Sequence, residues 1–430
     1  MQCEKKIDWL VVFFIIIQLF VSNEFFFVIG IILIIYIHSS KKNSIGKIYI
    51  IPEFRFIFFC ILIGVFLGLI SMGNQIVMFK DIIRDIFYFI NPLVFIYIGV
   101  LYSYQNMNIY TMCNSFIIGG IIVSIYELII TARNFSAAFN SVSVEQWRSS
   151  SGKGEIIITV ALAIMLSNVI PKKNEISRWI IYSGKAICGL YFIICLSRTN
   201  TIVLIILYIS LSIEKGNTQK FFISFFKGMI VFFVAIMIVI LLLPENIVEA
   251  YSDKIFSSFT EIGVNNNWSK ELNVVANWRG YENYCAIKQW NNYSAMKKII
   301  GAGFGEKIYV GKYAYTLLQQ VDDYGFPSCR IPILHNGYMT HLIKFGVFGL
   351  SVYVIFYISI VYKGIKYKRI DDSIESRLLI GIGVTFFIIT YFLNGLFGSY
   401  SWYSLLLTMG YSLNKYNNLL RGEKKCEKSI

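Results

Sequence analysis

Residues 54–73 read FRFIFFCILIGVFLGLISMG, a run of twenty residues in which Arg55 is the single charged side chain. An apolar run of this length is what an α-helix needs to cross the roughly 30 Å hydrocarbon core of a bilayer. The whole chain follows the same pattern, since 56% of its 430 residues are hydrophobic and only 15% are charged. In soluble domains, roughly 45–50% of the residues are apolar and about 25% are charged. The composition therefore predicts an integral membrane protein and excludes a soluble or disordered chain.

Apolar runs separated by short polar connections recur along the chain. They predict an all-α integral membrane protein with about twelve spanning helices. Their ranges are 9–22, 25–38, 54–73, 86–102, 110–131, 155–170, 178–196, 199–213, 220–243, 337–362, 377–396 and 400–416. Residues 74–86 interrupt one apolar run with Lys80, Asp81, Arg84 and Asp85. That spacing predicts an amphipathic interfacial helix ahead of the fourth span.

Lysine and arginine are unequally divided between the two sets of connecting segments. Most of them fall in one set, at Lys5, Lys6, Lys41, Lys42, Lys47, Lys172, Lys173, Arg178, Lys215, Lys220, Lys363, Lys366, Lys368, Arg369, Arg421, Lys424, Lys425 and Lys428. Because positively charged loops stay in the cytoplasm, we expect both termini there. The net charge of +14 then reflects orientation and attraction to anionic lipid, and nucleic acid is not an expected partner.

The longest polar segment, residues 244–334, follows the ninth expected span and therefore lies outside the cytoplasm. The expected organisation is helices at 1–243, an external loop at 244–334, helices at 335–416 and a basic cytoplasmic tail at 417–430. A loop this long inside a compact protein is usually functional, so we expect the chemistry on this side. Cys285 and Cys329 share the loop, and a disulfide between them is left open.

Arg198 is a basic residue on the side where few basic residues are expected. It lies in CLSRTN, residues 195–200, between two apolar runs with almost no loop, and is expected at the external membrane surface. One interpretation is a snorkelling arginine that anchors a tight helical hairpin. The other is an anion site, because a guanidinium offers a planar fork that matches phosphate oxygens.

Arg279 opens the segment WRGYENYCAIKQW, residues 278–290. Trp278, Tyr281, Cys285 and Lys288 recur in it at helical spacing. This pattern predicts an amphipathic helix along the outer surface, with tyrosine and tryptophan as interface anchors.

Two glycine-containing segments are further candidates. The first, GAGFG at residues 301–305, includes Gly303 and Gly305 and allows the backbone to approach a ligand or a neighbouring helix closely. The second, WRSSSGKG at residues 147–154, is an external basic loop that contains Arg148. A flexible, solvated loop is the alternative interpretation of this second segment.

His335 precedes Asn336 and Gly337 at the expected external start of the tenth span. A lone histidine is often structural, yet imidazole is the usual proton acceptor near neutral pH. His341 lies about 240° further round a helix, so it is expected to be a packing residue, and Lys344 is expected to serve helix packing. The three histidines are isolated and no Cys-x-x-Cys occurs, so neither a metal nor a cofactor is expected.

Three of these elements, in this order, resemble the O-antigen ligase and polymerase family of bacterial surface-polysaccharide assembly. They are Ser197-Arg198-Thr199, the segment from Trp278-Arg279 to the glycines at 301–305, and His335-Asn336-Gly337-Tyr338-Met339 followed by Lys344-Phe345-Gly346-Val347-Phe348-Gly349-Leu350. The resemblance covers roughly residues 190–350. It implies a GT-C-like membrane glycosyltransferase whose donor is an undecaprenyl-diphosphate-linked glycan.

The resemblance also implies roles for individual residues. Arg198 and Arg279 would bind the diphosphate, and His335 would act at the acceptor hydroxyl. Substrate binding would further involve Arg148, Asn336, Gly303 and Gly305. Two arginines aimed at the departing diphosphate would supply the charge stabilisation that a divalent metal gives elsewhere.

The leading functional hypothesis is an inverting, metal-independent polymerase that joins lipid-linked oligosaccharide repeat units on the outer face of the bacterial inner membrane. The alternative within the family is a ligase that moves the polymer to lipid A–core or another acceptor. A flippase or another secondary transporter would instead place ionisable residues near the bilayer midplane. A scaffold for a chain-length regulator leaves Arg198 and His335 unexplained. Expected partners are the lipid-linked oligosaccharide, membrane lipid and a chain-length regulator.

Overall fold

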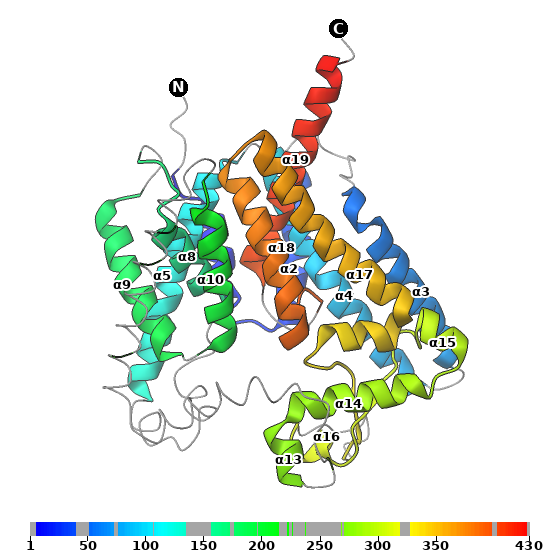
Figure 1. Ribbon diagram of the computed structural model, residues 1–430. Helices are drawn as coiled ribbons and strands as arrows, with labels where there is room; N and C mark the ends of the chain where they lie inside the picture. Colours follow the sequence, from blue (N-terminus) through cyan, green and yellow to red (C-terminus); the bar gives the residue numbers. More distant parts are fainter. Residues whose placement is uncertain are drawn as a thin grey trace.

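The computed structural model describes residues 6–39, 51–72, 76–105, 107–134, 156–172, 176–195, 197–214, 271–318, 327–397 and 402–427, and the single positions 222, 226, 237 and 268. Most of this part is helical. Its bundle consists of α1 (Trp9–Ile17), α2 (Asn23–Ser39), the 3₁₀ turn η1 (Pro52–Phe54), α3 (Arg55–Met72), α4 (Ile76–Tyr104), α5 (Ile109–Arg133), α8 (Ile156–Ser167), α9 (Arg178–Ile194), α10 (Arg198–Ser212), α17 (Gly337–Ile370), α18 (Ile374–Phe392) and α19 (Tyr403–Glu427). The bundle helices run side by side (Figure 1).

The chain is a helical membrane protein. Within the described ranges, five segments are long and apolar enough to cross a bilayer, namely Pro52–Ser71, Phe79–Tyr104, Ile109–Arg133, Gly337–Ile370 and Ile374–Phe392. Shorter apolar helices are Asn23–Ser39, Ile156–Ser167 and Arg198–Ser212. Helices are the expected solution, because lipid offers no hydrogen-bond partner to the backbone. The expected span at 220–243 lies outside the described residues apart from positions 222, 226 and 237.

A helix separate from the fourth span was predicted for residues 74–86, and in this respect the prediction was wrong. From Ile76 onward the chain forms one continuous helix, α4, which runs to Tyr104, and the segment of it that is apolar enough to cross a bilayer begins at Phe79. Asp81 and Asp85 are buried inside the protein. Each of the two carboxylates has a basic partner elsewhere in the fold, which is why they lie inside the protein.

The helix α17 breaks at Gly346, where the backbone has a φ of +65°. A side chain is strained in that conformation. A Cβ atom there would also lie 2.3 Å from the carbonyl oxygen of Ile299. The chain around Ile299 thus passes directly against the break, and residues 337–345 form a half-helix in front of the long part of α17.

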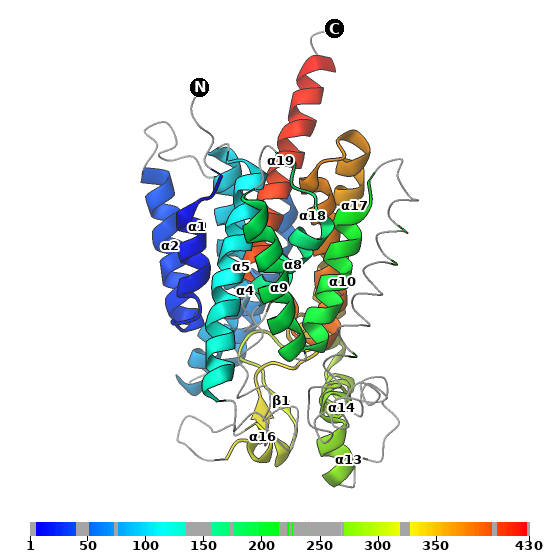
Figure 2. The same ribbon diagram turned by 90° about the vertical axis from the view of Figure 1, so that its left-hand side faces the viewer.

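A small unit formed by residues 271–318 and 327–331, which belong to the segment expected outside the cytoplasm and are named the external unit for that reason, lies at one end of the bundle. It contains α13 (Glu271–Ala276), α14 (Trp278–Asn291), α15 (Ala295–Ile300), β1 (Ile308–Tyr309), α16 (Tyr313–Thr316) and β2 (Arg330–Ile331). The two short strands pair antiparallel, with Ile308 opposite Ile331. Its core includes Cys285, Ala286, Val310 and Leu334. Figures 1 and 2 show α13, α14 and α16 at the end opposite to the C-terminal end of α19.

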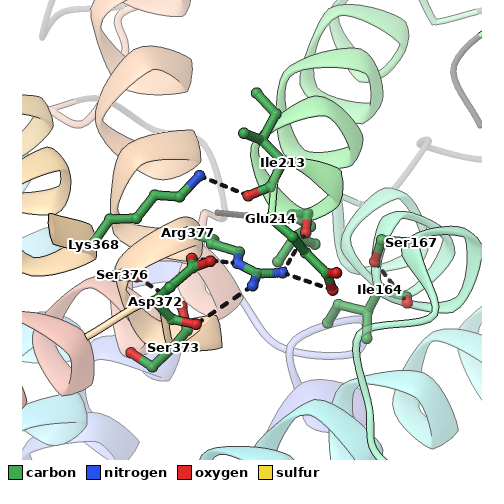
Figure 3. A network of polar contacts seen from close by, with 10 residues as sticks. Ile164, Ser167, Ile213, Glu214, Lys368, Asp372, Ser373, Ser376 and Arg377 are labelled. Atoms are coloured by element: carbon green, nitrogen blue, oxygen red, sulfur yellow. Dashed lines mark hydrogen bonds and ion pairs between the residues drawn. The ribbon is translucent and has the colours of Figure 1, made fainter. Parts of the chain in front are cut away.

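A polar network joins three helices at the other end of the bundle (Figure 3). Lys368, near the end of α17, donates to the carbonyl oxygen of Ile213 at 2.6 Å. Arg377, near the start of α18, donates to the carbonyl oxygen of Leu211 at 3.2 Å and pairs with Asp372. The C-terminal ends of α10 and α17 therefore meet. From this meeting point α10 leads back over 15 residues to Arg198, and α17 leads back over 34 residues, through its break at Gly346, to Gly337.

Candidate functional site

The site is centred on a contact between a histidine and a carboxylate. The Nδ1 atom of His335 lies 3.0 Å from both carboxylate oxygens of Glu282, and the backbone N–H of His335 donates to Oε2 of the same carboxylate at 3.0 Å. Glu282 is 1% exposed, whereas the His335 side chain is 31% exposed. A carboxylate accepts hydrogen bonds, so this contact assigns the proton of a neutral imidazole to Nδ1. The Nε2 atom is then left as the proton acceptor.

Local structure holds His335 in place on both sides. The next residue, Asn336, is the N-cap of α17, and its Oδ1 accepts from the backbone N–H groups of Tyr338 at 3.0 Å and Met339 at 3.3 Å. The preceding residue, Leu334, is fully buried and donates its N–H to Oγ1 of Thr340 at 3.2 Å. The histidine is therefore fixed at the entry to a capped helix. Part of the predicted binding role of Asn336 is in fact this cap, made by Oδ1.

Glu282 was not selected from the sequence. It lies in the predicted amphipathic segment, on a stretch of α14 that also buries Gly280, Asn283, Cys285 and Ala286. A glutamate on an otherwise buried helical face needs a partner. That was the signal in the sequence, but the partner is 53 residues away.

Arg279 lies one helical turn before Glu282. The two residues are both in α14 with a spacing of three, which places them on the same helix face with about 5–6 Å between their Cβ atoms. Arg279 is half-buried. The structure therefore brings this arginine close to the contact between Glu282 and His335.

Arg198 is the first residue of α10 and is also half-buried. Ser197 caps the helix, because its hydroxyl accepts from the backbone N–H of Asn200 at 3.3 Å. The helix start carries positive dipole charge. Arg198 lies at the end of α10 that is away from the contact between Ile213 and Lys368.

The glycines at 301–305 pack against neighbouring helices. A Cβ atom on Gly303, which has a φ of +90°, would lie 2.5 Å from the backbone nitrogen of Gly68 in α3. The N–H of Gly303 donates to the carbonyl oxygen of Lys344 at 3.0 Å, and the N–H of Gly305 donates to Oδ2 of Asp85 at 2.7 Å. Both glycines are buried. Of the two interpretations given above, close approach to a helix is therefore correct, and their assignment to direct substrate binding is corrected.

A buried ion pair anchors this glycine segment in the bundle. Nζ of Lys344 lies 2.5 Å from Oδ2 of Asp85, and both side chains are fully buried. Lys344 also donates to the carbonyl oxygen of Glu306 at 3.1 Å. A second pair nearby joins Lys307 to Asp81 at 2.7 Å. The two pairs tie the segment that follows α15 to α4 and α17, and so fix α14 relative to His335.

The remaining expected residues have different outcomes. Arg148 lies outside the described residues. Cys285 and Cys329 are both free thiols, the first buried and the second exposed, so the disulfide left open above is not formed. His341 is fully buried, and its ring stacks on that of Tyr353 with a centroid distance of 4.0 Å. This agrees with its expected role in packing.

The description of the site rests on its own residues. In the part of the chain that the structure describes, no group of three or more His, Cys, Asp or Glu side chains is placed to hold a metal ion. No protein-family model matches the chain, and no characterised protein matches its sequence. Among the described residues, the site offers an oriented imidazole whose Nε2 has no hydrogen-bond partner, and Arg279, a side chain suited to an anion, one helical turn from Glu282.

Proposed function

We propose that the protein is a membrane glycosyltransferase that polymerises oligosaccharide repeat units carried on undecaprenyl diphosphate. The observation that carries this proposal is the contact between His335 and Glu282, with Arg279 one helical turn away. A buried carboxylate that orients a histidine is a common arrangement for a general base. An arginine beside that base suits a substrate whose leaving group is a diphosphate.

In the proposed reaction, the acceptor hydroxyl oxygen attacks the anomeric carbon of the donor sugar. The bond between that carbon and the diphosphate oxygen breaks, and undecaprenyl diphosphate leaves with the bonding electrons. The hydroxyl proton passes to Nε2 of His335, and Glu282 stabilises the resulting imidazolium. Attack opposite the leaving group inverts the anomeric centre. Arg279 and Arg198 stabilise the negative charge that develops on the diphosphate.

The finer architecture belongs to the same proposal. Twelve spans and a GT-C-like arrangement would place both termini in the cytoplasm and the site on the periplasmic face of the inner membrane. Few basic residues are expected on that face, which is why Arg198 and Arg279 carry weight there. The proposed partners are the lipid-linked oligosaccharide, membrane lipid and a chain-length regulator.

A secondary transporter for the same lipid-linked glycan is the second candidate. The break in α17 at Gly346 and the buried pair of Asp85 and Lys344 favour it, because transporters often use broken helices and intramembrane charges. Here, however, the two charges bind each other and the backbone around Gly305 and Glu306. Nothing in that arrangement requires a transported ion, so we prefer the enzyme.

The test uses the purified full-length protein in lipid nanodiscs with lipid-linked repeat units from the source cells. No nucleotide and no lipid A–core is added, and EDTA removes divalent metal. The proposal predicts longer lipid-linked chains on a gel. Reaction only after addition of lipid A–core would identify a ligase. Translocation of the units in sealed vesicles without new glycosidic bonds would identify a transporter.

A further inference from the structure

Three asparagines adjoin His335 or Glu282, two of them in the sequence and one through a backbone contact, and each has a buried amide atom without a hydrogen bond to the described residues. These atoms are Oδ1 of Asn283, Nδ2 of Asn336 and Oδ1 of Asn394. The three residues are only 7%, 3% and 8% exposed. Leaving such an atom unbonded away from water costs about 1–3 kcal/mol. A partner that arrives from outside the chain would recover this energy.

Each of the three asparagines adjoins either the histidine or its carboxylate. Asn336 follows His335 directly, and Asn283 follows Glu282 in α14. Asn394 comes from a distant part of the chain, just after α18, and its backbone N–H donates to the carbonyl oxygen of His335 at 2.6 Å. This contact is close enough that a Cβ atom on Gly337 would lie 2.8 Å from the carbonyl oxygen of Asn394. The segment after α18 therefore forms a further side of the site.

The unbonded atoms indicate the chemical class of ligand. Oδ1 of Asn336 is occupied by the helix cap, so its free Nδ2 is a donor. The amides of Asn283 and Asn394 each carry one oxygen acceptor and one NH2 donor group. A sugar hydroxyl, which both donates and accepts, satisfies either end of an amide, whereas an anion can only accept. This side of His335 thus suits a neutral polyhydroxylated group, and the arginines suit the diphosphate.

We infer that Asn283, Asn336 and Asn394 bind the hydroxyl groups of the acceptor sugar and hold the attacking hydroxyl at Nε2 of His335. The inference rests on the proposed function and extends it. The diphosphate of the donor and the hydroxyl groups of the acceptor are recognised by two separate sets of residues.

The experiment measures binding of the free repeat-unit oligosaccharide, released from the lipid carrier of the source cells by mild acid. This probe has neither lipid nor diphosphate. Calorimetry on the full-length protein in nanodiscs compares the wild type with Asn394→Ala and Asn283→Ala. We expect each variant to bind the oligosaccharide about tenfold more weakly, which corresponds to about 1.4 kcal/mol. Binding of undecaprenyl diphosphate should be unchanged, which also establishes that the variants fold.

Asn414→Ala is the matched control. Asn414 is 7% exposed, like Asn394, but donates to Oγ of Ser103 at 3.0 Å within α19 and α4, so its loss should leave oligosaccharide binding intact. Wild-type affinity for the oligosaccharide in both site variants would overturn the inference. So would the absence of any oligosaccharide binding to the wild type, since these amides would then bind only water. Oligosaccharide binding with the expected losses but no chain elongation would reject the proposed polymerase and leave the sugar site standing.

Discussion

The Glu282 carboxylate accepts both the backbone N–H and the Nδ1–H of His335, although 53 residues separate the two in the sequence. Two bonds to one buried carboxylate fix the ring orientation and the tautomer. They also join α14 of the external unit to the start of α17. The free ring nitrogen is thereby positioned by the fold, which is a requirement for a general base.

Removing either partner of the buried pair of Asp85 and Lys344 alone should strongly destabilise the protein. Asp85→Asn or Lys344→Met leaves an uncompensated buried group, so we expect a loss of about 3–5 kcal/mol. The apparent melting temperature in detergent is the measurement. The double variant Asp85→Leu with Lys344→Met should recover much of the loss, because it removes both charges.

The exposed pair of Lys312 and Glu271, at 3.0 Å, supplies the control for that experiment. Lys312→Met should leave the melting temperature nearly unchanged, since exposed ion pairs contribute little. Equal melting temperatures for the wild type, Asp85→Asn and Lys344→Met would show that the buried pair does not anchor the glycine segment.

Arg198→Ala and Arg279→Ala should each abolish polymer formation while the protein still reaches the membrane. Removing one electrostatic stabiliser of a transition state typically costs 10²–10³-fold in rate, or about 3–4 kcal/mol. The length distribution of surface polysaccharide in complemented cells is the measurement. Arg330→Ala, an exposed arginine on β2 of the same external unit, is the control. Normal-length polysaccharide from either site variant would reject the diphosphate assignment.

Hydrophobic patterning alone was sufficient to predict the helical membrane class, because spanning length and apolar composition are local properties of the chain. The same reasoning failed at residues 74–86. Asp81 pairs with Arg84 one turn away in the same helix, but its second partner, Lys307, and the partner of Asp85, Lys344, are more than two hundred residues away. Only tertiary structure brings such charges together.

Only part of the candidate site could be predicted from the sequence. His335 and Arg279 stand out by residue type and position. Glu282 and Asn394 do not, since an acidic residue in an amphipathic helix and an asparagine after a helix are common. They become parts of a site only through their contacts with His335. The glycines at 303 and 305 show the opposite case, in which a motif that suits ligand binding serves helix packing.

His341→Phe should fold and retain activity, because the ring lies in an apolar cluster that includes Phe89, Phe345 and Phe397. Neither ring nitrogen of His341 has a hydrogen-bond partner among the described residues. Replacing such a group by an apolar one of similar shape is nearly neutral or stabilising. The melting temperature and the rate of chain elongation are the measurements. Loss of elongation at an unchanged melting temperature would give His341 a role that this account lacks.

Cysteine labelling tests both the orientation and the absence of the disulfide. Cys329 is exposed, whereas burial raises the pKa of the Cys285 thiol to about 11. A membrane-impermeant maleimide should therefore label Cys329 in intact spheroplasts at pH 7.5 and leave Cys285 unmodified, and Cys329→Ser should remove the signal. Labelling that requires permeabilised membranes would place this loop in the cytoplasm.

The same pKa gives a stability prediction with a definite sign. The folded state holds the Cys285 proton more tightly than the unfolded chain, whose thiol has its usual pKa of 9.0. The contribution of this buried thiol to the free energy of unfolding is therefore complete below pH 9 and is lost as the pH rises towards 11. Cys285→Ala should flatten this part of the curve of melting temperature against pH. An identical slope in wild type and variant would contradict the burial of the thiol.

The most direct test of the central claim is the rate of chain elongation by purified Glu282→Gln protein in nanodiscs, measured against wild type at equal folded concentration. The amide keeps the shape of the side chain but cannot accept two hydrogen bonds and stabilise an imidazolium in the same way. If Glu282 orients His335 as the base, elongation should fall at least about 10²-fold, and His335→Ala should be at least as impaired. Elongation at the wild-type rate by Glu282→Gln would contradict the account.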